Sequence, residues 1–280
     1  MTTLIDRRSS LVLIAVGAST LAVPARLTAM SAAEDALTTY LRIRSRIDGK
    51  PVFYPYRGTI FGRPIGKSAV PLFNVEGFSW DQVSAAGPGR FRLDTMEAGY
   101  FLDLATGQPL IEWTNPLNDV ATVVKHYRSF AHVEVSDGKL KPISPAIALP
   151  GAQFNASMGS PTILGDRIWV HEDLIARFPN KPASTFSDPR EYNGSMLEAA
   201  SLATWCASTI DLQDLRRAFV PATLSYQTVG SWRPFMKMGD TLGVISWRMF
   251  GTKVETIDEV PGALLKRVLD EYPDFLSRTA

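Results

Sequence analysis

Stretches in which hydrophobic and polar residues alternate recur along most of the chain. Such alternation, enriched in aromatic and β-branched residues, is typical of strands that bury one face. Short segments that contain glycine or aspartate separate the stretches, and this spacing is typical of an antiparallel meander. The sequence therefore predicts a mainly β fold of the α+β class, with a large antiparallel meander sheet that curls into a barrel. The alternating stretches are 52–61, 70–78, 90–96, 99–104, 110–114, 120–135, 223–229 and 243–250.

Three strand assignments have local features of their own. Pro55 cannot donate a ladder hydrogen bond, so its strand is predicted to lie at an edge or to carry a bulge. The long stretch 120–135 is expected to bend near Ser129. The stretch 196–207 fits a helix or a strand, and the alternation of apolar residues around Trp205 favours a strand.

Helices are predicted near both ends of the chain, where apolar residues recur every three or four positions. The first covers 33–44, and the last covers 259–272 with Pro261 in its first turn. A short helix at 211–218 begins at the cap residue Asp211.

A proline-rich segment, 141–189, interrupts the meander. Within it only 167–172 has a strand pattern, so we predict a long irregular excursion across the sheet. Loops of this length are usually functional or disordered. The sequence leaves open whether the segment is a lid over a pocket or a packed connection.

The N-terminal segment resembles a twin-arginine export signal. Arg7 and Arg8 precede a short apolar run that is too short, and too rich in small polar residues, for a membrane span. We therefore predict that residues 1–32 are an export signal that is removed. Residues 33–280 then form a single antiparallel β-barrel-like domain that is periplasmic or secreted. The alternative is an N-terminal tail on a cytoplasmic protein.

Charge and cysteine content limit the partners of the chain. A formal net charge of +1 over 280 residues gives no basic field, so no nucleic-acid partner is predicted. The mature chain is also predicted to have no membrane partner. Cys206 is the only cysteine, which excludes an intramolecular disulfide, and its apolar neighbours indicate a buried, unreactive thiol. The oligomeric state is left open, and a homodimer is compatible with the sequence.

Motifs for the common nucleotide cofactors and for serine hydrolases are absent from the sequence. There is no Gly-x-Gly-x-x-Gly after a strand, no P-loop and no Gly-x-Ser-x-Gly elbow. His126, His132 and Glu134 share one strand parity, but positions six residues apart in a strand are separated by about 20 Å. The sequence therefore predicts no cofactor and no metal site.

Acid/base chemistry by side chains remains as the type of catalysis. His126 is the leading candidate for a base because imidazole titrates near neutral pH. Glu97 is predicted to orient the base or to pair with Arg57. Tyr226 can donate a proton or bind a developing oxyanion. The predicted catalytic set is His126, Tyr226, Glu97 and Arg57, each with a structural alternative, whereas Lys253 is expected to be a solvated cation.

Aromatic side chains in or beside the predicted strands indicate the kind of ligand. Several such rings around a cavity suit a flat, apolar or phenolic molecule, with a few polar groups to orient it. The predicted substrate-binding residues are Tyr54, Tyr56, Tyr100, Trp113, Asn115, Trp232 and Phe235.

Short motifs recur through nearly the whole chain after the signal. They are R-I-D-G-K-P-V (46–52), G-T-I-F-G (58–62), F-N-V-E-G-F (73–78), E-A-G-Y-F-L-D (97–103), T-G-Q-P-L (106–110), W-T-N-P (113–116), S-W-R-P-F-M-K-M-G (231–239) and G-T-K (251–253). In these motifs the chain resembles an uncharacterised family, the domain of unknown function 1838. The resemblance implies an export signal in many members, but no established reaction or cofactor.

Three functions fit these observations. The favoured prediction is a cofactor-independent enzyme of the lyase or isomerase type, in which His126 removes a proton from an aromatic, phenolic or otherwise apolar small molecule. The alternatives are an exported carrier that binds such a molecule without catalysis, and a structural or partner-binding domain. The enzyme requires the central meander and the segment around Trp232 to converge on one ring-lined hollow with His126 at its wall.

Overall fold

The computed structural model describes residues 34–136, 138–143 and 150–277. The predicted export signal lies outside the described residues. None of the described helices is long and apolar enough to cross a membrane.

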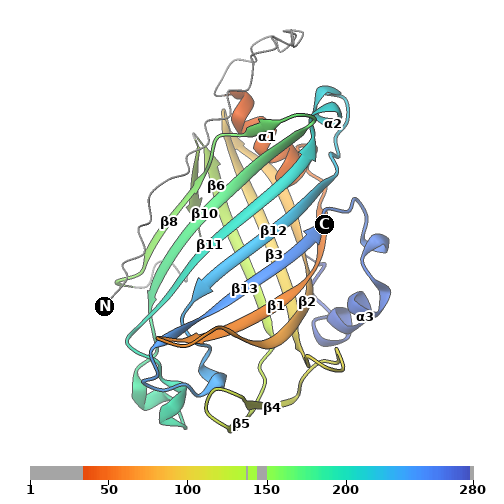
Figure 1. Cartoon of the computed structure of the whole chain (residues 1–280). Helices are drawn as coiled ribbons and strands as arrows, with labels where there is room; N and C mark the ends of the chain where they lie inside the picture. The colour runs from red at the N-terminus through yellow and green to blue at the C-terminus, as the bar shows by residue number, and fades with distance from the viewer. Residues whose placement is uncertain (1–33, 137, 144–149, 278–280) are drawn as a thin grey trace, which may run out of the picture. The chain divides into compact units, whose positions relative to one another are not determined.

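Antiparallel strands form a closed ten-strand barrel, which confirms the predicted fold class (Figure 1). Their order around the barrel is β11-β12-β13-β1-β2-β3-β6-β7-β8-β10. The pairing of β10 with β11 closes the barrel. The short strand β9 pairs with the first residues of β10. The strands of this sheet are β1 (Val52–Pro64), β2 (Val70–Gly87), β3 (Arg90–Leu102), β6 (Tyr127–Ser136), β7 (Lys139–Pro142), β8 (Gln153–Met158), β9 (Thr162–Leu164), β10 (Arg167–Pro179), β11 (Met196–Ser208), β12 (Ala222–Gly230) and β13 (Gly243–Thr252).

The helix α1 (Glu34–Arg44) packs against the interior residues at one end of the barrel. Tyr40 and Trp205 meet there edge to face, with ring centres 6.4 Å apart. The Lys253 ammonium donates to the carbonyl oxygens of Arg42 at 2.8 Å and Ile43 at 3.1 Å, and to that of Ser45. These bonds satisfy carbonyl groups at the helix C-terminus, where a cation is favoured. Lys253 is therefore a buried helix cap, and the expectation of a solvated cation was wrong.

The opposite end of the barrel is filled by a plug made of the hairpin β4 (Glu112–Asn115) and β5 (Val120–Val123) together with the 3₁₀-helix η4 (Pro234–Met236). The Asn115 amide donates to the Met236 carbonyl at 2.7 Å, and its oxygen accepts from the Leu117 backbone at 3.0 Å. Asn115 therefore ties the hairpin to η4.

The outer surface beside β1–β3 is covered by α3 (Gly262–Glu271) and the segment after it. Leu264 and Val268 of the helix are buried against outward-facing side chains such as Phe78. The Trp80 indole donates to the Phe275 carbonyl at 3.0 Å. A second short helix, α2 (Thr209–Gln213), is capped by the Ser208 hydroxyl rather than by Asp211.

The proline-rich segment differs most from the prediction. Residues 153–179 contain β8, β9 and β10, and β10 is a wall strand paired with β11 along its whole length. Among the described residues of this segment, Pro142 and Pro179 end β7 and β10, and Pro150, Pro161 and Pro182 lie outside the strands. These prolines therefore mark strand ends and turns rather than a continuous irregular excursion. The stretch 196–207 is strand β11, as favoured.

Two further predictions were only partly correct. The stretch 120–135 is broken at 124–126 into β5 and β6, rather than bent within one strand. Pro55 lies in a strand with neighbours on both sides. On the β13 side, Phe53 forms a bridge with Val254, and regular pairing with β13 begins at Tyr56. Pro55 lies between these two points, so its lack of an N–H group costs no hydrogen bond of the sheet.

Candidate functional site

Side chains from several strands meet inside the barrel, between α1 and the plug, around a cavity of about 140 Å³. We call it the lumen cavity. Trp205, Ala203 and Met249 give it an apolar wall. Its polar lining residues are Arg44, Tyr56, Ser79, Thr95, Glu97, Glu172 and Tyr226.

Two carboxyl groups line the lumen cavity, and Glu97 is the one to which no arginine of the described residues is bound. It lies on β3 opposite Ser79 of β2 and Ser129 of β6, and strand alternation turns all three side chains inward. The Ser129 hydroxyl donates to Glu97 Oε2 at 3.2 Å. Burial raises the pKa of Glu97, and hydrogen bonds from Tyr56 and Ser129 oppose this only in part. Glu97 therefore takes up a proton at higher pH than an exposed glutamate.

Tyrosine hydroxyl groups surround Glu97. The hydroxyl oxygens of Tyr56 and Tyr127 are 2.7 Å apart, and the Tyr226 hydroxyl donates to Ser201 Oγ at 3.1 Å. Burial raises the pKa of all three phenols. They are therefore neutral hydrogen-bond donors at physiological pH.

Two motif glycines make room for these tyrosine rings. A Cβ atom at Gly77 would clash with the Tyr56 hydroxyl, and a Cβ atom at Gly99 would clash with the Tyr127 ring. The glycines of the F-N-V-E-G-F and E-A-G-Y-F-L-D motifs thus leave space for tyrosine side chains inside the barrel.

Arg44 links α1 to two carboxylates of the wall. Its guanidinium binds Asp81, which is fully buried, and lies 3.1 Å from Glu172 Oε1. Tyr40 also donates to Glu172, and Thr95 donates to Asp81 at 2.6 Å. Burial alone would lower the pKa of Arg44, but the charges of Asp81 and Glu172 raise it instead. The arginine therefore stays charged and holds both carboxylates.

Trp205 presents an unused donor in the lumen cavity. The side chain is only 1% exposed, and its indole N–H has no hydrogen-bond acceptor among the described residues. Arg44 lies over the ring, 4.5 Å from its centre. Buried N–H groups are usually satisfied, so a bound molecule with an acceptor oxygen suits this position.

Solvent reaches the interior beside β6. Among the described residues β6 pairs with β7 only over 133–136, which leaves its first half without a partner on that side. Ser129 and Ala131 of this half face inward opposite Glu97 and Thr95, and both are exposed. A small molecule can therefore approach the carboxyl group of Glu97 from this side.

His126 lies beside α3, away from the lumen cavity. Its ring centre is 4.9 Å from that of Tyr100, which in turn stacks with Arg267 of α3 at 5.1 Å. The Phe101 backbone N–H donates to His126 Nδ1 at 3.2 Å, and burial lowers the pKa of the imidazole. The expected convergence of His126 with the interior candidates is therefore wrong. Tyr100 likewise faces α3, and catalysis by His126 stays a prediction.

The meander and the Trp232 segment do converge, but in the packed plug. Trp113 stacks near Phe73 with ring centres 4.4 Å apart, and Phe235 lies 6.1 Å from the same ring. The Trp232 indole donates to the Thr241 carbonyl at 2.8 Å. Of the remaining predicted binding residues, Tyr56 lines the lumen cavity, whereas Tyr54 is buried under α1 and donates to the Arg44 carbonyl at 2.7 Å.

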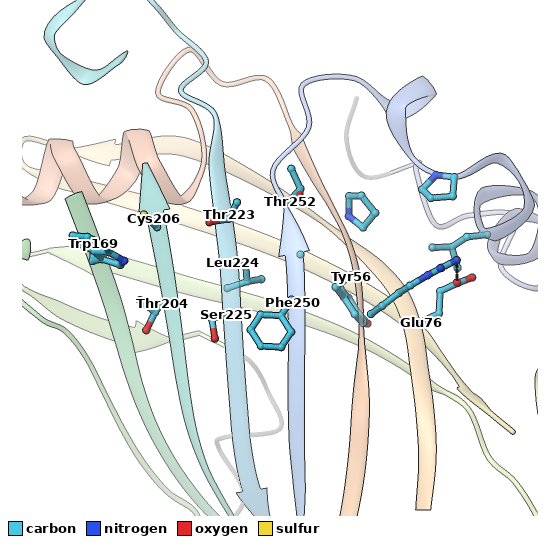
Figure 2. Close-up of a pocket in the computed structure, with 15 residues that line it drawn as sticks. Tyr56, Glu76, Trp169, Thr204, Cys206, Thr223, Leu224, Ser225, Phe250 and Thr252 are labelled. Atoms are coloured by element: carbon cyan, nitrogen blue, oxygen red, sulfur yellow. Dashed lines mark ion pairs between the residues drawn. The ribbon is translucent and has the colours of Figure 1, made fainter. Parts of the chain in front are cut away.

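A larger hollow of about 640 Å³ lies on the outside of the wall. Figure 2 shows Trp169, Cys206 and Phe250 along this groove, which crosses β10–β13 and β1. Arg57 lies here, 76% exposed, and pairs with Glu76 at 2.5 Å. The predicted pairing of Arg57 with Glu97 is therefore wrong, because the two side chains lie on opposite faces of the barrel wall.

The groove contains few groups that could do chemistry. Burial raises the pKa of the Cys206 thiol, which disfavours the reactive thiolate. Among the described residues no group of three or more His, Cys, Asp and Glu side chains is arranged to hold a metal ion. The lumen cavity is therefore the candidate site.

Sequence reasoning missed Arg44, Glu172 and Trp205 of the lumen cavity. Arg44 resembles an ordinary surface cation of α1, and Glu172 is the last residue of 167–172, the one short strand predicted within the proline-rich segment. The signal that could have found Glu172 is its place at an inward position of 168–176, between Val170 and Leu174.

Comparison with protein families gives a match. A family model described as a protein of unknown function (DUF1838) matches residues 49–279 of the chain. This range contains all strands of the barrel, whereas α1 with Arg44 precedes it. No curated protein matches the chain.

Proposed function

The chain belongs to the DUF1838 family, and we propose that it is an acid/base enzyme of the lyase or isomerase type whose base is Glu97. The observation that carries the proposal is the position of Glu97, a half-buried carboxyl group with a raised pKa among neutral hydroxyl donors at a ring-lined cavity. Perturbed carboxyl groups in such cavities are typical of catalytic acids and bases.

The reaction proposed is proton removal from a carbon atom next to a carbonyl group. The Glu97 carboxylate takes the proton, and the negative charge that develops on the carbonyl oxygen accepts a hydrogen bond from Tyr226 or Tyr56. Glu97 then returns the proton to another carbon, which completes an isomerisation. In a lyase reaction the electron pair instead expels a leaving group, to which the protonated Glu97 donates. Each step uses side chains of this chain only.

The substrate proposed is a small molecule with one aromatic ring and an oxygen acceptor. A cavity of about 140 Å³ is close to the roughly 150 Å³ cavity that accommodates benzene. The rings of Trp205, Tyr56 and Tyr226 suit stacking on such a molecule, and the free Trp205 N–H suits its oxygen. The N-terminal pattern supports action outside the cytoplasm.

The test is retention of small molecules by variants with a blocked cavity. Protein is incubated with a plant or soil extract and washed, and the retained compounds are identified by mass spectrometry. Ala203→Leu fills the lumen cavity and is expected to lose the retained compound. Ala200→Leu, on the outer face of the same strand, is the matched control and is expected to keep it. Circular dichroism checks that both variants fold.

The result of this experiment distinguishes the proposed enzyme from a carrier protein. Conversion of the retained compound into an isomer or an elimination product supports the enzyme. Retention in the lumen without any conversion supports the carrier. Equal retention by both leucine variants contradicts a site in the barrel interior.

A further inference from the structure

The S-W-R-P-F-M-K-M-G motif has two charged residues, Arg233 and Lys237, and Lys237 pairs with Asp188 at 3.2 Å. Neither the plug nor the proposed reaction uses Arg233. It immediately precedes η4, and its guanidinium lies 5.4 Å from the ring centre of Trp247, an inward-facing residue of β13. Trp247 packs against Tyr127 with ring centres 5.4 Å apart, and the Tyr127 hydroxyl oxygen lies 2.7 Å from that of Tyr56, which lines the lumen cavity. Arg233 therefore extends from the plug toward the space that Glu97 and Tyr226 line.

Arg233 has no counter-ion in the part of the chain that the structure describes. No carboxylate lies within 4.0 Å of its guanidinium, and no protein acceptor takes a hydrogen bond from it. By contrast, Arg44 at the end of α1 and Arg46 just after it each bind two carboxylates. Arg233 is exposed, so its five N–H donors are accessible to a ligand.

We propose that Arg233 binds the carboxylate group of a substrate whose ring occupies the lumen cavity. The inference rests on the proposed function and names its substrate class, a single-ring aromatic monocarboxylate. The planar guanidinium matches a carboxylate through two parallel hydrogen bonds, and the stacking on Trp247 fixes its plane.

The charges around the site favour a single negative charge on the ligand. The unpaired guanidinium of Arg233 supplies one positive charge at the site. A ligand with one negative charge neutralises it. The carboxyl groups of Glu97 and Glu172 also line the lumen cavity, so a doubly charged ligand would be repelled.

The orientation that follows places the reacting atoms near Glu97. Glu97 and Tyr226 line the lumen cavity and also interact with Arg233. A molecule with its carboxylate at the plug and its ring toward Trp205 therefore passes between the base and the hydroxyl donor.

The experiment compares benzoate with benzamide, which have nearly the same shape and differ in charge. Their affinities for the full chain are measured by isothermal titration calorimetry at neutral pH. Benzoate is expected to bind about 10- to 100-fold more tightly than benzamide, the range typical of a charge-assisted hydrogen-bond pair. Arg233→Gln is expected to remove this preference. Arg248→Gln is the matched control, because Arg248 stacks on Phe61 at 5.1 Å on the outer face.

Equal affinities in the wild type, or a preference that survives Arg233→Gln, overturn the inference. If either result is found but Ala203→Leu still abolishes binding, the binding site in the lumen is supported and only the role of Arg233 is contradicted. If Ala203→Leu leaves benzoate binding unchanged, the proposed function fails as well. Absence of binding for both probes overturns the inference, while the proposed function is then decided by the retention of extract compounds.

Discussion

Replacing Glu97 with glutamine is expected to lower turnover of the retained compound by about 10²- to 10⁴-fold, the usual contribution of a general base. Glutamine keeps the shape of the side chain and can accept the hydrogen bond from Ser129, but it cannot take up a proton. Wild-type turnover should rise with pH as Glu97 ionises, at a pH above the ordinary glutamate range, because burial raises the pKa of this group. The measurement is the initial rate as a function of pH, followed by mass spectrometry.

Stability serves as the control for this variant. A glutamate whose pKa is raised on folding stabilises the protein at low pH, and this contribution is lost as pH rises through the raised pKa. Glu97→Gln should therefore gain stability relative to wild type in mildly alkaline buffer and not in acidic buffer. Glu76→Gln on the outer wall is expected to keep full turnover. An active Glu97→Gln variant would remove Glu97 from the mechanism.

Replacing Arg44 with methionine is expected to reduce the free energy of unfolding by about 3–5 kcal/mol, which is typical when one partner of a buried ion pair is removed. Asp81 is fully buried, and it would keep only the hydroxyl of Thr95 as a side-chain partner. Glu172 would keep only Tyr40. The loss is measured by urea unfolding.

Arg57→Met is the control for the Arg44 variant. Arg57 also binds a carboxylate, but it is 76% exposed, and exposed pairs contribute about 0–1 kcal/mol. Asp81→Asn combined with Arg44→Met should recover part of the loss, because the fully buried position 81 then carries no unpaired charge. Equal losses for the two methionine variants would contradict a buried network under α1.

The sequence predicted the barrel because the strands alternate in hydrophobicity and because glycine and aspartate mark the turns. It failed at 153–179 for a physical reason. The inward position Glu172 is polar, which interrupts the alternation, and its partner Arg44 lies 128 residues away. Hydrophobic pattern alone cannot show that a distant helix supplies the countercharge of a buried carboxylate.

The candidate site was predicted in part. Glu97, Tyr56 and Tyr226 share the lumen cavity, and their inward parity was visible in the sequence. His126 was favoured because imidazole titrates near neutral pH. The sequence did not show the break at 124–126, so it could not show which face of the wall His126 occupies, and His126 lies beside Tyr100 on the outward face of β3. The role of a side chain in a barrel depends first on which face it occupies.

The most direct test of the account is the titration of the Glu97 carboxyl group. Carbon-13 NMR of protein labelled at glutamate side chains, with Glu97→Gln to assign the signal, reports its pKa with and without the retained compound. We predict a pKa above the ordinary glutamate value, and a change in this pKa when the compound binds. An ordinary pKa that is insensitive to the compound would contradict a catalytic carboxyl group inside the barrel.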